Sequence, residues 1–148
     1  MSNRWDRYFF DICIAVSSKS SCLSRQVGAI LVRDHSIVAT GYNGPARGFP
    51  HCKMQCPRKV AGYKSGEGLH ICPAAHAEGN CIANAARLGV IVSNTTLYLN
   101  QTTPCKDCMI LLVNAGITEV VAETSILYHE LSKQIAEHGK IKIRKFDL

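Results

Sequence analysis

Apolar residues recur along the chain at two different periods, one typical of helices and one typical of strands. Residues 5–16 follow the three- and four-residue spacing of an amphipathic helix. The apolar positions in it are Trp5, Tyr8, Phe9, Ile12, Cys13 and Val16. Residues 27–32 and 36–42 are apolar runs on either side of a polar Arg-Asp pair, which predicts a hairpin of two strands. We expect the helix to cover one face of the resulting sheet.

The second half of the chain alternates predicted helices with predicted strands. Helices are expected over residues 76–88, after Pro104 and near 125–138, and strands over residues 95–100, 116–122 and 140–146. Helices between successive strands imply parallel pairing, whereas the opening hairpin is antiparallel. We therefore predict an α/β fold with the order α β β α β α β α β. It is one domain spanning residues 1–148, a three-layer α/β/α arrangement around a five-stranded mixed sheet.

The segment over residues 41–68 is rich in glycine, proline and positive charge, and it shows no regular period. Loops longer than about 15 residues are usually functional, disordered or pinned by a further interaction. Its basic residues, with no acidic residue among them, are Arg47, Lys53, Arg58, Lys59 and Lys64. Together with a net charge of +6, this run favours an anionic partner such as a phosphorylated metabolite or a nucleic acid. The alternative is an ordinary solvated surface run.

Composition changes how the cysteines are interpreted. With 47% hydrophobic and 19% charged residues, the chain has the balance of a soluble globular protein. No apolar run reaches about 18 residues and the start carries charges, so we predict a cytoplasmic protein with neither signal peptide nor membrane span. In a reducing compartment the eight cysteines are metal ligands, catalytic groups or small core residues rather than disulfides. Cys13 and Cys81 fall on apolar helix faces and are assigned to the core.

The stretch "CPAAHAEGNC", residues 72–81, places His76 and Glu78 among small apolar residues. A buried carboxylate there costs several kcal/mol unless the protein uses it. Cys105 and Cys108 follow Pro104 at the expected start of a helix, where the positive end of the helix favours thiolates. We therefore predict that His76, Cys105 and Cys108 bind a catalytic zinc ion.

Three protein ligands leave the fourth tetrahedral position of zinc open for water, as in catalytic zinc sites. Glu78 then lies beside that water without being a ligand, and we expect it to shuttle the water's proton to the substrate. Each motif alone is weak evidence for a catalytic zinc site, because a C-x-x-C pair also occurs in redox motifs and structural zinc knuckles. The combination of H-A-E with P-C-K-D-C is the signature of zinc-dependent nucleobase deaminases.

At this point the chain resembles a known family, the deoxycytidylate (dCMP) deaminases of the cytidine deaminase superfamily. The likeness includes "SRQVGAILV" at 24–32, "GYNG" at 41–44, Asn80, and "AGITEVV" at 115–121. The resemblance implies hydrolytic removal of the amino group at cytosine C4, a homo-oligomer, and possible control by dCTP and dTTP. It assigns Asn43 to the substrate's sugar, although Asn43 also suits a plain turn residue. The backbone near Ala77 and Thr102 is expected to line the base.

The resemblance also places Arg47 and Lys53 where a triphosphate effector would meet them. Two departures from the family pattern concern the substrate. Gly79 stands where a bulky apolar residue is more common, which predicts extra space near the pocket. "GPARG" replaces the commoner spacing of proline after "GYNG". Both changes leave open whether a 5-substituted cytosine nucleotide is the substrate.

A second cluster of possible ligands consists of Cys22, Cys52, Cys56 and Cys72, with His51 and His70 as spare nitrogen donors. The family resemblance implies a structural zinc at positions like Cys22 and Cys52. A four-thiolate ion would pin the long loop without taking part in chemistry. The alternative is a set of free buried cysteines, which are common.

Our first hypothesis is a zinc enzyme that converts dCMP to dUMP and ammonia. The same zinc core permits a deaminase acting on tRNA or single-stranded nucleic acid, which the basic charge favours. A third hypothesis from another class is a noncatalytic nucleotide-binding module on the same fold. The intact Glu78 argues against it, because a pure binding protein does not need that carboxylate.

Overall fold

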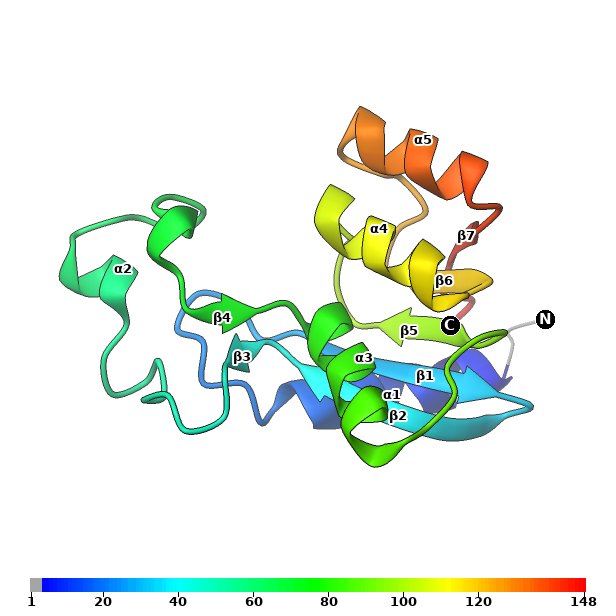
Figure 1. Ribbon diagram of the computed structural model, residues 1–148, viewed down its shortest axis with the longest axis horizontal. Helices are drawn as coiled ribbons and strands as arrows, with labels where there is room; N and C mark the ends of the chain where they lie inside the picture. The colour runs from blue at the N-terminus through cyan, green and yellow to red at the C-terminus, as the bar shows by residue number, and fades with distance from the viewer. Residues whose placement is uncertain (1–3) are drawn as a thin grey trace.

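The computed structural model describes residues 4–148, so residues 1–3 of the predicted domain lie outside the described range. Its centre is a five-stranded sheet in the order β2-β1-β5-β6-β7 (Figure 1). The strands are β1 (Gly28–Arg33), β2 (Ser36–Tyr42), β5 (Thr96–Leu99), β6 (Glu119–Ala122) and β7 (Lys142–Lys145). β1 pairs antiparallel with β2 and β5, whereas β5, β6 and β7 are parallel to one another. The predicted mixed sheet is confirmed.

Helices cover both faces of this sheet, as predicted. α1 (Arg4–Ser17) packs on β1, β2 and β5 from one side. α3 (Ala77–Leu88) and α4 (Lys106–Ala115) lie on the other side, with α5 (Glu130–His138) packed against α4 (Figure 1). The helix expected near 125–138 begins only at Glu130, because the His129 side chain accepts a hydrogen bond from the backbone N–H of Leu131 and caps the helix there.

β1 shows how its residues divide between the two faces of the sheet. Ala29 and Leu31 belong to the core beneath α3 and α4, whereas Ile30 and Val32 belong to the core beneath α1 with Phe9. This is the two-residue period of a strand, and burial on both faces explains why β1 is continuously apolar. Cys13 and Cys81 are fully buried, one in each core, as assigned from the sequence.

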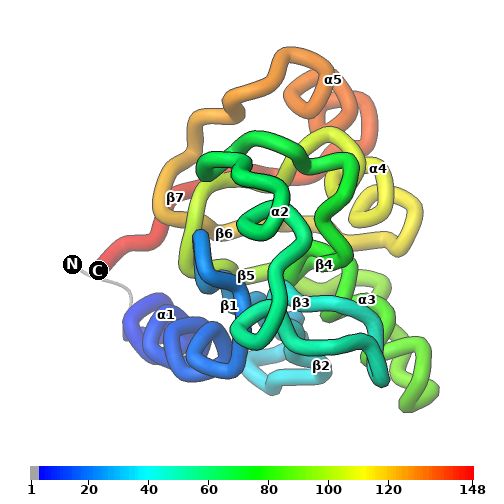
Figure 2. The backbone as a smooth tube through the Cα atoms, turned by 90° about the vertical axis from the view of Figure 1, so that its left-hand side faces the viewer, coloured from blue at the N-terminus to red at the C-terminus, as the bar shows by residue number. Residues whose placement is uncertain are grey.

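The irregular segment contains short elements that the sequence did not predict. β3 (Gly44–Pro45) pairs antiparallel with β4 (Ala74–Ala75), and between them lie α2 (Pro57–Val60) and the 3-10 helix η1 (Leu69–Ile71). Two-residue strands and a single helical turn are too short to show a period in the sequence. We call residues 46–73 the β3–β4 loop. It projects from one end of the sheet, at the left of Figure 1 and toward the viewer in Figure 2.

Gly41 allows α3 to lie directly on β2. A Cβ atom at this position would be 2.3 Å from the backbone nitrogen of Cys81 and 2.7 Å from the carbonyl oxygen of Ala77. No side chain fits in that space, so only glycine permits the approach. The first turn of α3, which carries Glu78, is therefore held close to the end of β2. No helix within residues 4–148 is long and apolar enough to span a membrane.

A buried ion pair joins the first helix to the last strand. The Asp6 carboxylate is fully buried and accepts hydrogen bonds from Arg144 Nη1 (2.6 Å), Arg144 Nη2 (2.9 Å) and the backbone N–H of Asp147 (2.9 Å). Burial raises the pKa of Asp6, but the hydrogen bonds from Arg144 and Asp147 and the charge of Arg144 outweigh it, so the pKa is lowered overall. The folded protein therefore favours the ionised carboxylate.

Replacing Asp6 with Ala should lower the free energy of unfolding by about 3 kcal/mol at neutral pH, because the Arg144 charge loses its buried partner. The folded-state pKa lies below the unfolded value of about 3.9, so this stabilisation is full above that value and is lost as the pH falls through the folded pKa. Urea unfolding of both proteins between pH 7 and pH 3 measures the difference. The difference in the free energy of unfolding between the two proteins should be constant down to about pH 5 and should then decrease.

Asp11→Ala is the matched control on the same helix. Its carboxylate pairs with Arg7 at 3.7 Å on the exposed face, where such pairs contribute about 0 to 1 kcal/mol. Equal losses for the Asp6 and Asp11 variants would contradict a stabilising role for the buried pair.

Candidate active site

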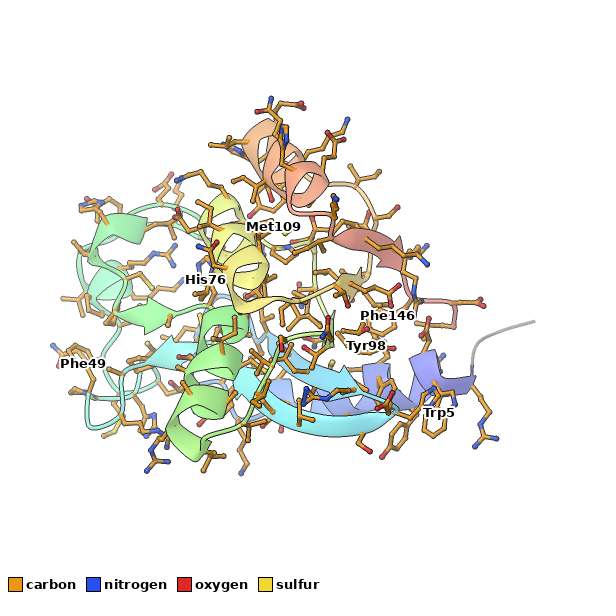
Figure 3. The ribbon with its side chains drawn as sticks, turned by 45° about the vertical axis from the view of Figure 1, so that its right-hand side comes forward. Trp5, Phe49, His76, Tyr98, Met109 and Phe146 are labelled. Atoms are coloured by element: carbon orange, nitrogen blue, oxygen red, sulfur yellow. The ribbon has the colours of Figure 1, made fainter. Side chains whose placement is uncertain are left out.

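Two helices begin at the site, and each begins at a predicted metal ligand. His76 is the N-cap residue of α3, and Cys105 is the N-cap residue of α4. The Cys105 thiol sulfur accepts a hydrogen bond from the backbone N–H of Cys108 at 3.5 Å, as an N-cap side chain should. Since helix N-termini carry partial positive charge, both starts favour thiolates and other anions here. Figure 3 shows His76 at the start of α3, between α4 and the β3–β4 loop.

The three predicted ligands of the catalytic zinc lie together. His76 Nδ1 is 3.5 Å from Cys105 Sγ and 3.4 Å from Cys108 Sγ, and all three ligand atoms lie within 4.8 Å of one another. Tetrahedral zinc with ordinary Zn–S and Zn–N bonds separates these atoms by about 3.6 Å. The arrangement therefore fits a zinc ion. Within residues 4–148 no other three His, Cys, Asp or Glu ligand atoms come this close together.

The protonation of Cys105 also suits a cation. The hydrogen bond with the Cys108 thiol is the main cause that lowers the pKa of Cys105 to about 4; burial opposes it, and His76 adds to it. The pKa of Cys108 is raised, because its thiol is hydrogen bonded to Cys105 and is buried. Cys105 is therefore a thiolate at neutral pH, and thiolates are the form that binds zinc.

Glu78 is buried in the first turn of α3, with 6% of its surface exposed. Burial raises the pKa of its carboxyl, and its own backbone N–H and His76 offset only part of the rise. It does not belong to the set of metal-ligating atoms. A carboxyl group held in this way beside a metal cluster suits the transfer of protons, because its pKa is shifted toward the working pH.

A cavity of about 350 Å³ opens over this cluster. His76, Glu78 and Cys105 contribute to its wall, whereas the buried Cys108 does not. The residues predicted to contact the substrate line the same cavity: Asn43, Ala77 and Thr102. They come from three separate places in the chain, namely the end of β2, the start of α3 and the segment before α4. Contact between these three residues and a substrate stays a prediction.

The Asn43 side chain already has partners within the protein. Its Oδ1 accepts a hydrogen bond from the backbone N–H of Val27 (2.8 Å), and its Nδ2 donates to the carbonyl of Arg25 (2.9 Å). Asn80 in turn donates to the carbonyl of Tyr42 (2.8 Å) beside it. Asn43 therefore holds the segment before β1 in place, a role that its position in the "GYNG" stretch did not indicate.

Sequence reasoning missed seven polar residues that line the cavity: Ser24, Arg25, Arg58, Ser65, Gln101, Thr103 and Tyr128. The basic run pointed to Arg58 only as a member of a charged segment. Arg47 and Lys53, which were assigned to an effector, do not line the cavity, and Arg47 donates to the side chain of Asn84 (3.1 Å). The side of the loop on which these two side chains lie could not be predicted, because the segment has no regular period in the sequence.

The second cysteine cluster gathers around Cys52, a buried residue of the β3–β4 loop. The pKa of its thiol is raised, first by burial and then by the nearby Cys56, Cys22 and Cys72. The four sulfurs are neighbours, but no three of them lie within 4.8 Å of one another. All four are free thiols. His70 packs edge-on against Tyr63, and neither His51 nor His70 belongs to a group of three metal-ligating atoms in the described part of the chain.

Gly79 does not enlarge the cavity, so that prediction is wrong. A Cβ atom added to Gly79 would lie 3.8 Å from the Cδ2 atom of Leu111 on α4, and Gly79 is not part of the cavity wall. A side chain at position 79 would therefore lie between α3 and α4 and not in the cavity. The reason is that residue 79 lies about 100° around the helix from Glu78.

Comparisons with known proteins identify relatives of this chain. Residues 3–124 match the family model of the cytidine and deoxycytidylate deaminase zinc-binding region. Deoxycytidylate deaminase of Saccharomyces cerevisiae is 37% identical over 147 residues, which are 99% of this chain and 46% of the relative. That of Mycobacterium phage D29 is 37% identical over 122 residues, 79% of this chain and 92% of the relative. The chain thus spans less than half the length of the yeast protein.

A solved structure shows the same fold. The dCMP deaminase of cyanophage S-TIM5, in complex with dCMP and dUMP, superposes with a TM-score of 0.77 at 23% identity and covers 99% of both chains. The family model and the two relatives, together with the fold, agree with the cluster of His76, Cys105 and Cys108 found in the structure. The chain belongs to the cytidine and deoxycytidylate deaminase family.

Proposed function

We propose that the protein catalyses the zinc-dependent hydrolysis of dCMP to dUMP and ammonia. The observation that carries this proposal is the His76, Cys105 and Cys108 cluster beside the buried Glu78, at the wall of one cavity. The deoxycytidylate deaminases of yeast and phage D29 support the nucleotide assignment. Two cavity arginines, Arg25 and Arg58, add positive charge where a nucleotide substrate would need it.

The chain's own residues divide the work of this reaction. His76, Cys105 and Cys108 would hold the zinc ion, which when bound lowers the pKa of a coordinated water toward neutrality. Glu78 accepts a proton from that water and returns it to the substrate, so that C4 gains oxygen and the amino group leaves as ammonia. The backbone near Ala77 and Thr102 would contact the base. Asn43, which lines the same cavity, would contact the sugar.

An assay of ammonia release tests the proposal. Purified protein is incubated separately with dCMP, CMP, deoxycytidine, dCTP and a tRNA substrate. We expect the highest kcat/KM with dCMP. Activity confined to tRNA or a single strand would support the nucleic-acid deaminase instead, and zinc-loaded protein with no activity on any substrate would support the noncatalytic nucleotide-binding module.

We further propose that Cys22, Cys52, Cys56 and Cys72 bind a second, structural zinc ion. Four thiols around one buried position suit a closed four-ligand site, and zinc would draw the sulfurs together. Cys22 precedes β1, whereas the others belong to the β3–β4 loop or its end, so the ion would tie that loop to the body of the protein. Cys22 and Cys72 also line the active-site cavity.

Replacing Cys52 with Ser should remove one of two zinc equivalents per chain and loosen the β3–β4 loop. The reason is that a hydroxyl is a much poorer zinc ligand than a thiolate. Elemental analysis measures the zinc content, and limited proteolysis measures the exposure of the loop. Cys13→Ser is the control, because Cys13 is buried in the core beneath α1, on the face of the sheet opposite α3 and α4. One equivalent in fully loaded wild-type protein would refute the second site.

The remaining assignments are proposals as well. We place the enzyme in the cytoplasm, which agrees with eight free cysteines. We propose a homo-oligomer, and large apolar side chains exposed on α3 and α4 support it, namely Leu88, Ile110 and Leu111. Control by dCTP and dTTP rests on the family resemblance alone.

A further inference from the structure

The three residues before the Cys105 ligand lie in an irregular segment whose backbone is not held by the sheet. Within residues 4–148, no backbone–backbone hydrogen bond includes Thr102, Thr103 or Pro104. Thr103 and Pro104 are nevertheless buried, with at most 2% of their surfaces exposed. Other contacts must therefore fix the direction from which the chain reaches Cys105.

Two side-chain hydroxyls provide these contacts, and both join the segment to the start of the last helix. Thr103 Oγ1 donates a hydrogen bond to the carbonyl of Ile126 (3.0 Å), in the segment before α5. Ser132 Oγ, in the first turn of α5, donates to the carbonyl of Pro104 (3.0 Å). The two bonds run in opposite directions, so two consecutive residues before Cys105 are tied to α5 and its approach.

Ser132 is an unusual residue for its position. It is 1% exposed and shares the buried face of α5 with Ala136, and α5 packs against α4. Burying a hydroxyl costs free energy unless it is hydrogen bonded, and a helical serine can bond to a carbonyl of the preceding turn in its own helix. Ser132 donates to Pro104 instead. Since alanine would satisfy the packing alone, the hydroxyl serves the Pro104 carbonyl.

The two bonds act on the metal cluster through one short stretch of backbone. Pro104 directly precedes Cys105, which is both a predicted ligand and the N-cap of α4. Cys108 lies in the first turn of the same helix, and its backbone N–H donates to Cys105 Sγ. A shift of the Pro104 carbonyl would therefore move both thiols relative to His76, whose position is set separately by α3.

We propose that Ser132 and Thr103 are positioning residues of the catalytic metal cluster, which hold the thiols of Cys105 and Cys108 at the metal position before the ion arrives. This inference rests on the proposed metal-dependent function. Groups that orient the ligands of a metal site typically contribute about 10- to 100-fold to metal affinity or activity. The last helix thus takes part in the chemistry, although it carries none of the three ligands.

Cobalt(II) in place of zinc is the probe, because tetrahedral cobalt bound to thiolates absorbs visible light, whereas zinc does not. The part of the spectrum that Cys105→Ser lacks belongs to the catalytic cluster. Ser132→Ala and Thr103→Val each remove one hydroxyl. We expect each variant to bind cobalt at the catalytic cluster about 10- to 100-fold more weakly in competition with a chelator, with an altered thiolate-to-cobalt absorption band.

Kinetics give a second measurement. Ser132 does not line the cavity, so its replacement cannot act through contact with the substrate. With saturating zinc, Ser132→Ala should lower kcat for dCMP about tenfold and leave KM within about twofold, because the metal cluster is disturbed while the substrate contacts are retained. Thr103→Ser keeps the hydroxyl and should retain wild-type metal affinity. Thr103→Val keeps the shape but loses the hydroxyl, and it should not.

Thr95→Val is the matched control for the loss of a buried hydroxyl. Thr95 is 1% exposed and donates to the carbonyl of Val92 (2.6 Å), and it does not line the cavity. This variant should lower the melting temperature about as much as Thr103→Val does, but it should leave cobalt affinity and kcat unchanged. If Ser132→Ala does not fold, the two Thr103 variants decide the question.

Wild-type cobalt affinity and spectrum in both Ser132→Ala and Thr103→Val would overturn the proposal. An equal loss of affinity in Thr95→Val would also overturn it, because the loss would then reflect a general loosening of the fold. Weaker cobalt binding in the two variants alone supports the proposal even if the wild type deaminates nothing, an outcome that would overturn only the proposed function. A wild-type protein without the Cys105-dependent cobalt spectrum would overturn both.

Discussion

Glu78→Gln should leave the zinc bound and reduce kcat with dCMP by more than about 10⁴-fold. One acid-base group usually contributes about 10²- to 10⁴-fold. Here the same carboxyl serves two steps, because it takes a proton from the water and gives one to the substrate. Glutamine has nearly the same size and can still hydrogen bond, but it cannot carry a proton between the two. The measurement is single-turnover deamination together with zinc analysis of the same sample.

The metal content separates this mechanism from a structural role of Glu78. Glu78 is not one of the three ligands, so the variant should retain all of its zinc and the wild-type melting temperature within a few degrees. Glu123→Gln is the control for an exposed carboxylate outside the cavity wall, and it should keep its activity. Near-normal turnover by the Glu78 variant would exclude the proton shuttle, and loss of zinc would show that Glu78 supports the metal cluster instead.

The zinc cluster could be predicted from the sequence because its ligands and the neighbouring Glu78 fall into two short motifs. His76 lies two residues from Glu78, and Cys105 lies three residues from Cys108. At the start of a helix the three-residue spacing of Cys105 and Cys108 places both side chains on the same face whatever the rest of the fold does. Only one long-range contact, between the starts of α3 and α4, was needed to complete the cluster. The joint presence of the two motifs predicted that contact.

The sheet could be predicted for a similar reason. Strands such as β1 and β5 are buried on both faces, so they stand out in the sequence as continuous apolar runs. The start of α5 could not be predicted, because the cap at His129 is a local hydrogen bond rather than a pattern of hydrophobicity.

The substrate side of the cavity could not be predicted, because its residues converge only through the tertiary structure. Arg25 and Arg58 are 33 positions apart in segments without a period, and nothing in the sequence distinguishes Arg58 from its exposed neighbour Lys59. The structure separates the two, since one guanidinium is buried in the cavity wall and the lysine is not. The contacts of Asn43 could not be predicted either. Its motif indicates a turn, but it does not show that the side chain bonds to the segment before β1.

The metal itself can be removed with little disturbance of the fold through Cys105→Ser. Cys105 is the N-cap of α4, and serine is among the residues preferred at that position, so the helix should still begin at Lys106. The thiolate ligand is lost, however, and zinc affinity should fall by orders of magnitude. Activity should fall by at least about 10³-fold, since the metal supplies several kcal/mol of stabilisation to the reaction.

Zinc analysis of two serine variants makes this test specific to the catalytic cluster. Cys105→Ser should lose the catalytic equivalent and keep the structural one, whereas Cys52→Ser should show the reverse. Circular dichroism of Cys105→Ser should match that of the wild type, because the cap and the core residues of α4 are retained. Full activity in a Cys105→Ser protein that contains no zinc at this cluster would disprove a metal-dependent reaction. Loss of both equivalents together would show that the two clusters depend on each other through their shared cavity wall, which Cys22, Cys72 and Cys105 all line.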